Sequence, residues 1–456
     1  MEREKLGSRL GFILLSAGCA IGIGNVWKFP YMVGQYGGGL FVLIYLFFLV
    51  IFGVPVMTME FSLGRASQKS PVKLYQQLEP AGSKWHLHGI AAFIGNVLLM
   101  MFYTNVSGWL LQYFVKMVKG DFSGMSSSAV NTEFSEMLAD PWAQILFMAV
   151  VVIVGVTVCF FGVKNSLEKI TKVMMLALLV IMIVLAFNGF FLDGAKAGIK
   201  FYLVPNFDTM REIGIFNIIT GALSQAFFTL SLGIGSMAIF GSYLSRERSL
   251  LGESLNVAML DTFVAFVSGL IIFPACFTYN DGVVDAGPPL IFQTLPNVFV
   301  NMPLGRLWGS LFFLFLSFAA LSTIFAVFEN IFACEMDLFG WSRKKACIIG
   351  GSALFVLSIP CILGFNVLSG FTPFGEGSSV LDLEDFIVSN LLLPIGSFIF
   401  VLFCVCKKGW GWDNFVKEAN EGKGAKLANW MRVYMKYVLP VIMVAFIIIS
   451  IVTFFV

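Results

Sequence analysis

Long apolar runs separated by short polar connectors occupy almost the whole sequence. Nearly every run reaches the roughly 20 residues that an α-helix needs to cross a hydrocarbon core of ~30 Å. The pattern predicts an all-α membrane protein, and it excludes a soluble domain or a β-barrel with its alternating strands. The eleven predicted spans lie near residues 9–35, 40–64, 88–118, 142–162, 167–191, 215–243, 254–279, 304–334, 345–364, 384–406 and 433–455.

Three glycines and an amide interrupt the first span near its middle. The stretch 17–25 contains Gly18, Gly22, Gly24 and Asn25. Unwound backbone leaves N–H and C=O groups that lipid cannot satisfy, so it persists only inside protein or beside a polar cavity. The first span is therefore predicted to be a broken helix whose freed carbonyl groups are available to a cation.

A second interruption, TLSLGIG at 229–235, lies in the sixth span. Matched breaks five spans apart indicate two five-span repeats with the substrate site between the breaks. Because five is an odd number, the second repeat runs inverted relative to the first. The predicted organisation is a first repeat in 1–192, a second repeat in 215–407 and one additional C-terminal span in 433–456.

The basic residues predict the orientation in the membrane. The chain is 58% hydrophobic and 12% charged, and 22 of its 29 Lys and Arg fall on the inner side if the N-terminus is cytoplasmic. Cytoplasmic connectors are enriched in Lys and Arg, so we expect a cytoplasmic N-terminus and an external C-terminus.

The lipid bilayer is an expected partner, nucleic acid is not, and the oligomeric state is not indicated. His86 and His88 fall in a cytoplasmic connector and are expected on the surface.

Three carboxylates are predicted at membrane depth: Glu60, Asp261 and Glu329. Each costs roughly 2.5 to 3.5 kcal/mol at a helix centre and so needs a partner. For Asp261 we favour a metal cation shared with Asn25 and Thr229, the alternative being a carboxyl that is protonated or satisfied by neighbouring helices. Glu60 is expected to brace amides of the second break, and Glu329 to be structural or to face water.

Other polar residues inside the spans have two interpretations. Ser322 and Thr323 are adjacent hydroxyls beside small residues, a pattern more often typical of helix packing or of bonding back to the helix backbone. Tyr103 alone is usually a packed aromatic residue. Their pattern by itself leaves both a ligand role and a structural role open.

Five segments together resemble the neurotransmitter:sodium symporters, and within that family the bacterial eleven-span amino-acid transporters of the leucine, tyrosine and tryptophan type. They are RLGFIL at 9–14, GCAIGIGN at 18–25, KFPY at 28–31, GGG at 37–39 and QAFFTLSLGIG at 225–235. The resemblance runs from Arg3 to the last span. It implies the inverted-repeat fold with broken helices 1 and 6, the fold that also illustrates the general repeat rule used above.

The resemblance implies two sodium sites. The first is formed by the Ala20 carbonyl, the side chains of Asn25, Thr229 and Asp261, and the carboxylate of the substrate. The second is formed by the carbonyls of Gly18, Ile21 and Ala319 and the hydroxyls of Ser322 and Thr323.

The resemblance also implies the residues of the substrate site between the two breaks. The substrate carboxylate meets Tyr103 and the amides of Gly22 and Gly24, and its ammonium group faces carbonyls near Phe228 and Ser231. The side-chain pocket is lined by Ile23, Leu99, Phe228, Ile234 and Val327, with Ala20, Thr229 and Thr323 also in the substrate-binding set. An apolar pocket excludes charged side chains. Ile234, where a larger aromatic is common, leaves room for an aromatic substrate.

Two gates follow from the same resemblance. Lys28 and Asp385 form the outer gate, and Arg3, Asp337 and Tyr243 form the inner one. The family often has Asn at the position of Asp261, and its animal members complete the charge with chloride. The fixed carboxylate of Asp261 therefore implies chloride-independent transport.

The predicted function is sodium-coupled symport of a neutral hydrophobic, possibly aromatic, amino acid by alternating access across the inner (plasma) membrane. A non-transporting amino-acid sensor or an ion channel on the same fold are the alternatives. The chain is not expected to be an enzyme, because the spans contain no His, GxSxG or HExxH from which a catalytic site could be built.

Overall fold

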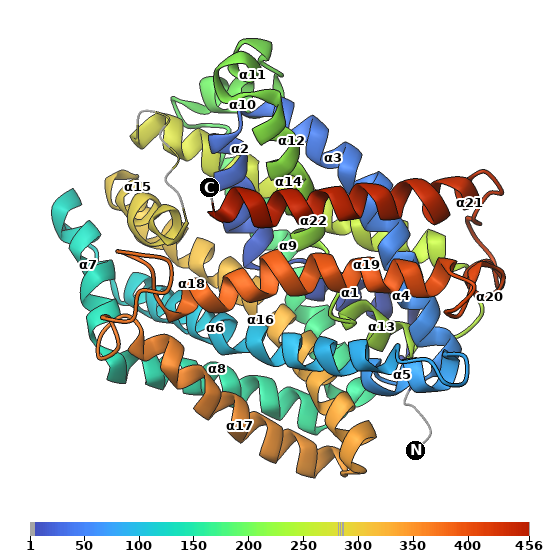
Figure 1. Cartoon of the computed structure of the whole chain (residues 1–456). Coiled ribbons are helices and arrows are strands. Elements are labelled where there is room, and N and C mark those ends of the chain that lie inside the picture. Colours follow the sequence, from blue (N-terminus) through green and yellow to red (C-terminus); the bar gives the residue numbers. More distant parts are fainter. Residues whose placement is uncertain (1–4, 281, 283, 285–286, 456) are drawn as a thin grey trace.

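The computed structural model describes residues 5–280, 282, 284 and 287–455, and in that part of the chain the architecture is entirely helical (Figure 1). The helices are α1 (Arg9–Ala20), α2 (Phe29–Gln35), α3 (Gly39–Phe48), α4 (Val54–Ser67), α5 (Pro71–Leu78), α6 (His86–Lys119), α7 (Ser127–Ala139), α8 (Pro141–Phe160), α9 (Glu168–Gly189), α10 (Ala195–Leu203), α11 (Phe207–Ile213), α12 (Ile215–Thr229), α13 (Ser236–Gly241), α14 (Leu250–Tyr279), α15 (Leu295–Asn301), α16 (Gly305–Phe339), α17 (Arg343–Leu363), α18 (Val380–Asp385), α19 (Leu393–Val405), α20 (Trp412–Ala419), α21 (Met431–Val433) and α22 (Leu439–Phe455).

The described residues contain nine continuous helical segments long and apolar enough to cross a membrane. A tenth span is the broken pair Arg9–Ala20 and Gly24–Gln35, whose two parts are bent by 58°. The sixth predicted span appears as α12, a shorter apolar helix, followed after an interruption by α13. Length and composition thus support up to ten spans among the described residues, and the predicted count of eleven stays a prediction.

Most π-helical turns in the described part of the chain come just before a proline. Proline has no N–H and its ring collides with the carbonyl four residues earlier, so the preceding turn must widen or break. Five of the six π turns precede Pro30, Pro55, Pro296, Pro394 and Pro440 by two residues; they are Gly24–Lys28, Leu49–Gly53, Leu290–Thr294, Phe386–Leu392 and Tyr434–Val438. These prolines bend spans without ending them.

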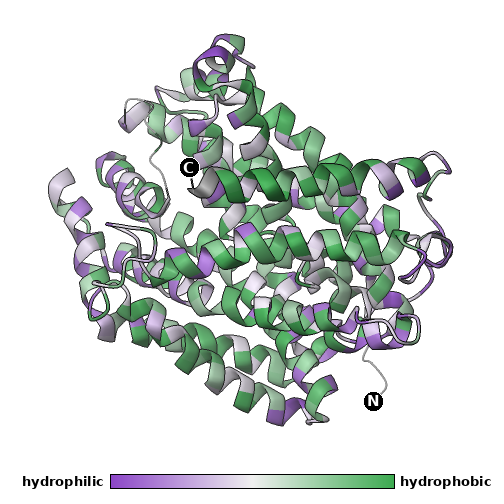
Figure 2. Ribbon diagram, in the orientation of Figure 1, coloured by the Kyte–Doolittle hydropathy of each residue, from purple (hydrophilic) through white to green (hydrophobic). Residues whose placement is uncertain are grey.

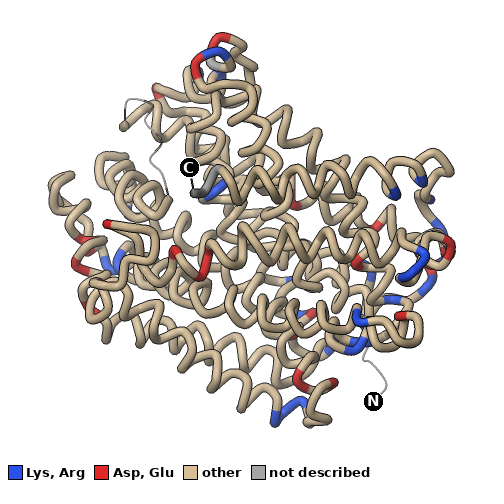
Figure 3. Tube along the Cα trace, viewed as in Figure 1, with Lys and Arg blue, Asp and Glu red and all other residues tan. Residues whose placement is uncertain are grey.

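The broken helices lie in the interior of the bundle. α1 packs against α9, α14 and α16, and α13 packs against α4. α16 is the most buried span, with 78% of its apolar window covered, whereas 28% of the last span is covered. Apolar residues dominate the bundle between its two ends (Figure 2), and most charged residues gather at those ends (Figure 3). This distribution is what a lipid-embedded bundle requires.

A buried ion pair fastens α20 to the end of α4. The Arg65 side chain is fully buried, and its Nε donates to Glu418 Oε1 at 2.7 Å. Glu418 also pairs with Arg246 at 3.1 Å, and Arg246 in turn reaches the half-exposed Glu421 at 3.5 Å. The connector between the last two spans is thereby held against the rest of the bundle.

We expect Glu418→Gln to destabilise the protein strongly, because it leaves the buried Arg65 guanidinium without its counter-charge. Removing one partner of a buried pair costs about 3 to 5 kcal/mol. The measurement is the melting temperature of the purified protein in detergent. The matched control is Glu421→Gln, whose exposed pair is worth at most ~1 kcal/mol. Equal melting temperatures for the two variants would contradict the assignment.

Candidate substrate and cation sites

The first break opens where α1 ends at Ala20. The amide of Gly22 donates to Asn25 Oδ1 at 3.2 Å, and the amide of Ile23 donates to Tyr103 Oη at 3.1 Å, so side chains replace the missing helical partners. A Cβ at position 22 would lie 2.4 Å from Tyr103 Oη and 2.8 Å from Thr323 Oγ1. Only glycine permits α6 and α16 to approach the break this closely.

The second break separates α12 from α13. Ser231, Gly233 and Gly235 have φ values of 51°, 98° and 73°, which end the helix. The Gly233 amide donates to Glu60 Oε1 at 2.6 Å, which confirms that Glu60 braces this break. The carbonyl of Ile234 accepts from Asn96 Nδ2 at 2.8 Å.

His88 is buried, which corrects its predicted surface position. Its side chain packs edge-on against Phe400, with centroids 4.9 Å apart, and its Nδ1 lies 2.7 Å from Tyr75 Oη. The prediction was wrong because α6 begins earlier than the apolar run suggested, so its first turn lies against α5 and α19. His86, two residues earlier, is half-exposed and contacts Glu79 at 2.7 Å.

Asn25, Thr229 and Asp261 converge between the two breaks. Asn25 Nδ2 donates to Asp261 Oδ1 at 2.8 Å, and Thr229 Oγ1 donates to Asp261 Oδ2 at 3.0 Å. All three residues are buried, and so is Ala20. Within the described residues the Asp261 carboxylate accepts from two neutral donors, the Asn25 amide and the Thr229 hydroxyl, while Asn25 Oδ1 accepts from the Gly22 amide. Their role as a cation site stays a prediction.

The five oxygen atoms predicted for the second cation site also lie together. Ser322 Oγ is 3.0 Å from the Gly18 carbonyl, 3.5 Å from that of Ile21 and 2.8 Å from that of Ala319. Thr323 Oγ1 is 3.1, 3.4 and 3.4 Å from the same three oxygens. The hydroxyls bond to their own helix, as the structural interpretation has it, but they also reach across to α1. A donor set composed only of oxygen atoms fits a hard cation such as Na⁺.

The predicted substrate residues surround the same region. Tyr103 lies against Gly22, and a Cβ on Gly24 would be 2.6 Å from the ring of Phe228. Ser231 Oγ donates to the Cys19 carbonyl at 3.2 Å, so it links the two breaks. The remaining pocket residues, Ile23, Leu99, Ile234 and Val327, are all buried. Their role as a pocket stays a prediction.

The predicted gate residues also contact neighbouring groups, and the Asp385 carboxylate acts electrostatically on Lys28. The Lys28 ammonium lies 3.9 Å from the centroid of the Phe228 ring, and Asp385 accepts from Ser389 Oγ at 2.6 Å. Asp337 accepts from the amide and the hydroxyl of Ser70 at 2.9 and 2.6 Å. Arg3 lies outside the described residues. Both gates stay predictions.

Glu329 is structural and paired. It accepts from Tyr243 Oη at 2.6 Å and from Arg343 Nη1 at 2.6 Å. Arg343 was not anticipated, although it is the first residue of α17 and only 14 positions away. A basic residue just after a span is the signal that could have identified this partner.

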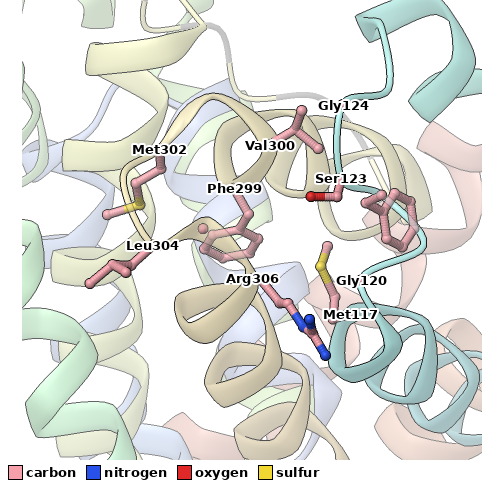
Figure 4. Close-up of a pocket in the computed structure, with 11 residues that line it drawn as sticks. Met117, Gly120, Ser123, Gly124, Phe299, Val300, Met302, Leu304 and Arg306 are labelled. Carbon is pink, nitrogen blue, oxygen red and sulfur yellow. The ribbon is translucent and has the colours of Figure 1, made fainter.

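A cavity of about 270 Å³ lies away from both breaks, at the C-terminal ends of α6 and α15 and the N-terminal end of α16 (Figure 4). Its lining includes Met117, Phe299 and Met302, and the Arg306 guanidinium beside it donates to the Val118 carbonyl. None of the predicted substrate or cation residues lines it. The cavity is therefore not the predicted site.

Comparison with known proteins identifies the family to which the chain is similar and a solved structure with a similar fold. The family model described as "Sodium:neurotransmitter symporter family" matches residues 3–136 and 133–455. The uncharacterised sodium-dependent transporter YhdH of Bacillus subtilis (strain 168) is 36% identical over 404 residues, which cover 88% of this chain and 87% of the relative. A sodium- and chloride-dependent taurine transporter of Bos taurus is 26% identical over 493 residues, or 97% of this chain and 77% of the relative. The crystal structure of MhsT in complex with L-phenylalanine has a TM-score of 0.87 and 34% identity, with 98% and 99% of the two chains covered.

We expect Gly233→Ala to abolish correct folding of the second break. The new Cβ would lie 2.1 Å from the Leu393 carbonyl oxygen, in addition to the left-handed φ of 98°. The control is Gly375→Ala, which has a similar φ of 103° but no atom within 4 Å of its Cβ. That variant should lose only the ~1–2 kcal/mol of left-handed backbone strain. Yield and monodispersity in size-exclusion chromatography compare them; equal behaviour would contradict the close packing on α19.

Proposed function

The chain belongs to the sodium:neurotransmitter symporter family, and on this premise we propose that it couples inward Na⁺ flux to uptake of a neutral hydrophobic amino acid. It is a sodium-dependent, multi-pass membrane transporter of this family, and its relatives are transporters rather than enzymes. The predicted bacterial family membership is thereby confirmed, as is the prediction that the chain is not an enzyme.

The observation that carries the proposal is the meeting of both broken helices around oxygen atoms. Asn25 follows the first break, Thr229 precedes the second, and both bond to Asp261 on α14. The second oxygen cluster joins the end of α1 to α16. A cation at either place would hold a broken helix against an unbroken one. We propose one Na⁺ at each.

We propose that the substrate is a hydrophobic amino acid, with aromatic amino acids among the candidates. The pocket residues Ile23, Leu99, Ile234 and Val327 are apolar and buried, and a charged substrate side chain there would be costly to desolvate. The fold neighbour MhsT, 34% identical, was solved with L-phenylalanine, which supports an amino acid of this kind. The substrate carboxylate would complete the shell of the first sodium ion, so each ligand would raise the affinity for the other.

Alternating access is the proposed mechanism. Eleven spans would form two inverted repeats, 1–192 and 215–407, followed by the span 433–456, with the N-terminus cytoplasmic and the C-terminus outside. Closure at Lys28 and Asp385 would precede opening at Arg3, Asp337 and Tyr243. Each net positive charge carried inward gains about 2.3 kcal/mol per 100 mV of inside-negative potential.

Uptake of labelled phenylalanine, tyrosine, tryptophan and leucine into proteoliposomes tests the proposal. We expect accumulation under an inward Na⁺ gradient, and equal uptake with K⁺ in place of Na⁺ would contradict it. Ser322→Ala should raise the half-saturating Na⁺ concentration roughly 10- to 150-fold, since a ligand contact to a charge is worth about 1.5–3 kcal/mol. The control, Ser317→Ala, lies on the same helix and loses only a bond to the Phe313 carbonyl.

Wild-type uptake should be the same in chloride and in gluconate, because Asp261 supplies the fixed negative charge. Asp261→Asn keeps the shape of the side chain but removes that charge. We expect its uptake to collapse in gluconate and to recover partly in chloride, which can replace the charge. Wild-type uptake that needs chloride would refute chloride independence while leaving sodium coupling intact.

A further inference from the structure

A buried carboxyl near the predicted outer gate belongs to neither cation site. Glu384, on α18 next to Asp385, is 4% exposed. Within the described residues its Oε2 has no hydrogen-bond partner. The sequence pattern alone does not distinguish Glu384, because it stands at the edge of a span beside Asp385, an acidic residue assigned to the gate.

Two other helices contribute polar groups to the same place. The Glu384 carboxyl acts electrostatically on the Cys361 thiol of α17, which also lies beside the Asn105 side chain of α6. Asn105 Nδ2 donates to the carbonyls of Met101 and Ser358 at 2.9 and 3.0 Å, but its Oδ1 accepts no bond from the described residues. Both Cys361 and Asn105 are buried.

The donors and acceptors of this cluster do not balance if Glu384 is ionised. Glu384 Oε2 and Asn105 Oδ1 both need a donor, and the thiol offers a single weak one. A neutral carboxylic acid adds the missing O–H donor. An isolated carboxylate in the interior is also far costlier than a protonated one.

The charged surroundings favour the neutral acid as well. α18 contributes Asp382, whose charge acts on Cys361, and the adjacent Asp385. From α17 and α6 the facing groups are the Cys361 thiol and the uncharged side chains of Asn105, Thr104 and Ser358. No positive charge from the described residues is among the groups that act on Glu384.

We propose that Glu384 is a proton-binding site, occupied while α18 is packed against α6 and α17. Its link to transport rests on the proposed function. If the outer gate opens by moving α18, Glu384 meets water and releases its proton, and closure takes one proton up from outside. Acid outside then favours the closed form, and the apparent substrate affinity falls at alkaline pH by at most about tenfold per pH unit.

Infrared spectra of the purified full-length protein, compared between H₂O and D₂O and between variants, test the proton site without any transport assay. The wild type should show a carboxylic-acid C=O band that shifts in D₂O and is missing from Glu384→Gln. The control, Glu376→Gln in the exposed preceding connector, should keep the band. If the amide variant does not fold, Glu384→Leu removes the same band. A band unchanged in both Glu384 variants would overturn the proposal.

Sodium-driven uptake measured against external pH tests the link to the gate. The half-saturating substrate concentration of the wild type and of Glu376→Gln should rise at alkaline pH, and Glu384→Gln should flatten that rise. Equal profiles in all three, with the infrared band present, would overturn the coupling. If the wild type shows no sodium-dependent uptake, the proposed function is contradicted, but the proton site that the infrared band reports is not.

Discussion

Backbone groups released inside a membrane must find partners within the protein, and this requirement organises the centre of the structure. Lipid offers no hydrogen bonds, so each break survives only where side chains replace the helical ladder. Glu60 and Asn96 serve the second break, and Asn25 and Tyr103 serve the first. The breaks also require glycine, because the partner groups approach the backbone so closely that a Cβ atom would collide with them.

The buried carboxylates show which sites lack a positive charge of their own. Glu329 faces Arg343, Glu253 faces Arg9 and Glu418 faces Arg65. In the described part of the chain, the hydrogen bonds to the Asp261 side chain come from the amide of Asn25 and the hydroxyl of Thr229, which are both neutral. Since buried charges need compensation, the first three are complete as ion pairs. Asp261 has no such ion pair among the described residues. Under the proposed function a mobile cation would supply the missing charge there, and a proton would do so at Glu384.

Local signals made much of this predictable. The length of each apolar run predicts a span, and the glycines beside Asn25 predict the first break. Both features can be predicted because they depend on residues that are neighbours in the sequence. Contacts between distant segments were harder to predict: the burial of His88 depends on α5 and α19, and the position of Lys28 over the Phe228 ring depends on where the second break sits. The cation residues were obtained from a family resemblance, whereas their convergence became visible only in three dimensions. The missing donor at Glu384 likewise needs three helices to be seen together.

Placing each proposed cation site between a broken and an unbroken helix would have a thermodynamic consequence. A ligand shifts a conformational equilibrium only by the difference between its affinities for the two states. Oxygen atoms that all belonged to one rigid helix would bind Na⁺ equally in every conformation, so the ion would not shift the conformational equilibrium. Gly18 and Ile21 lie at the end of α1, whereas Ser322 and Thr323 lie on α16, so any relative motion of these helices separates the ligands. The free energy of cation binding then becomes free energy for holding one arrangement of the bundle, which is what coupling between an ion gradient and a substrate requires.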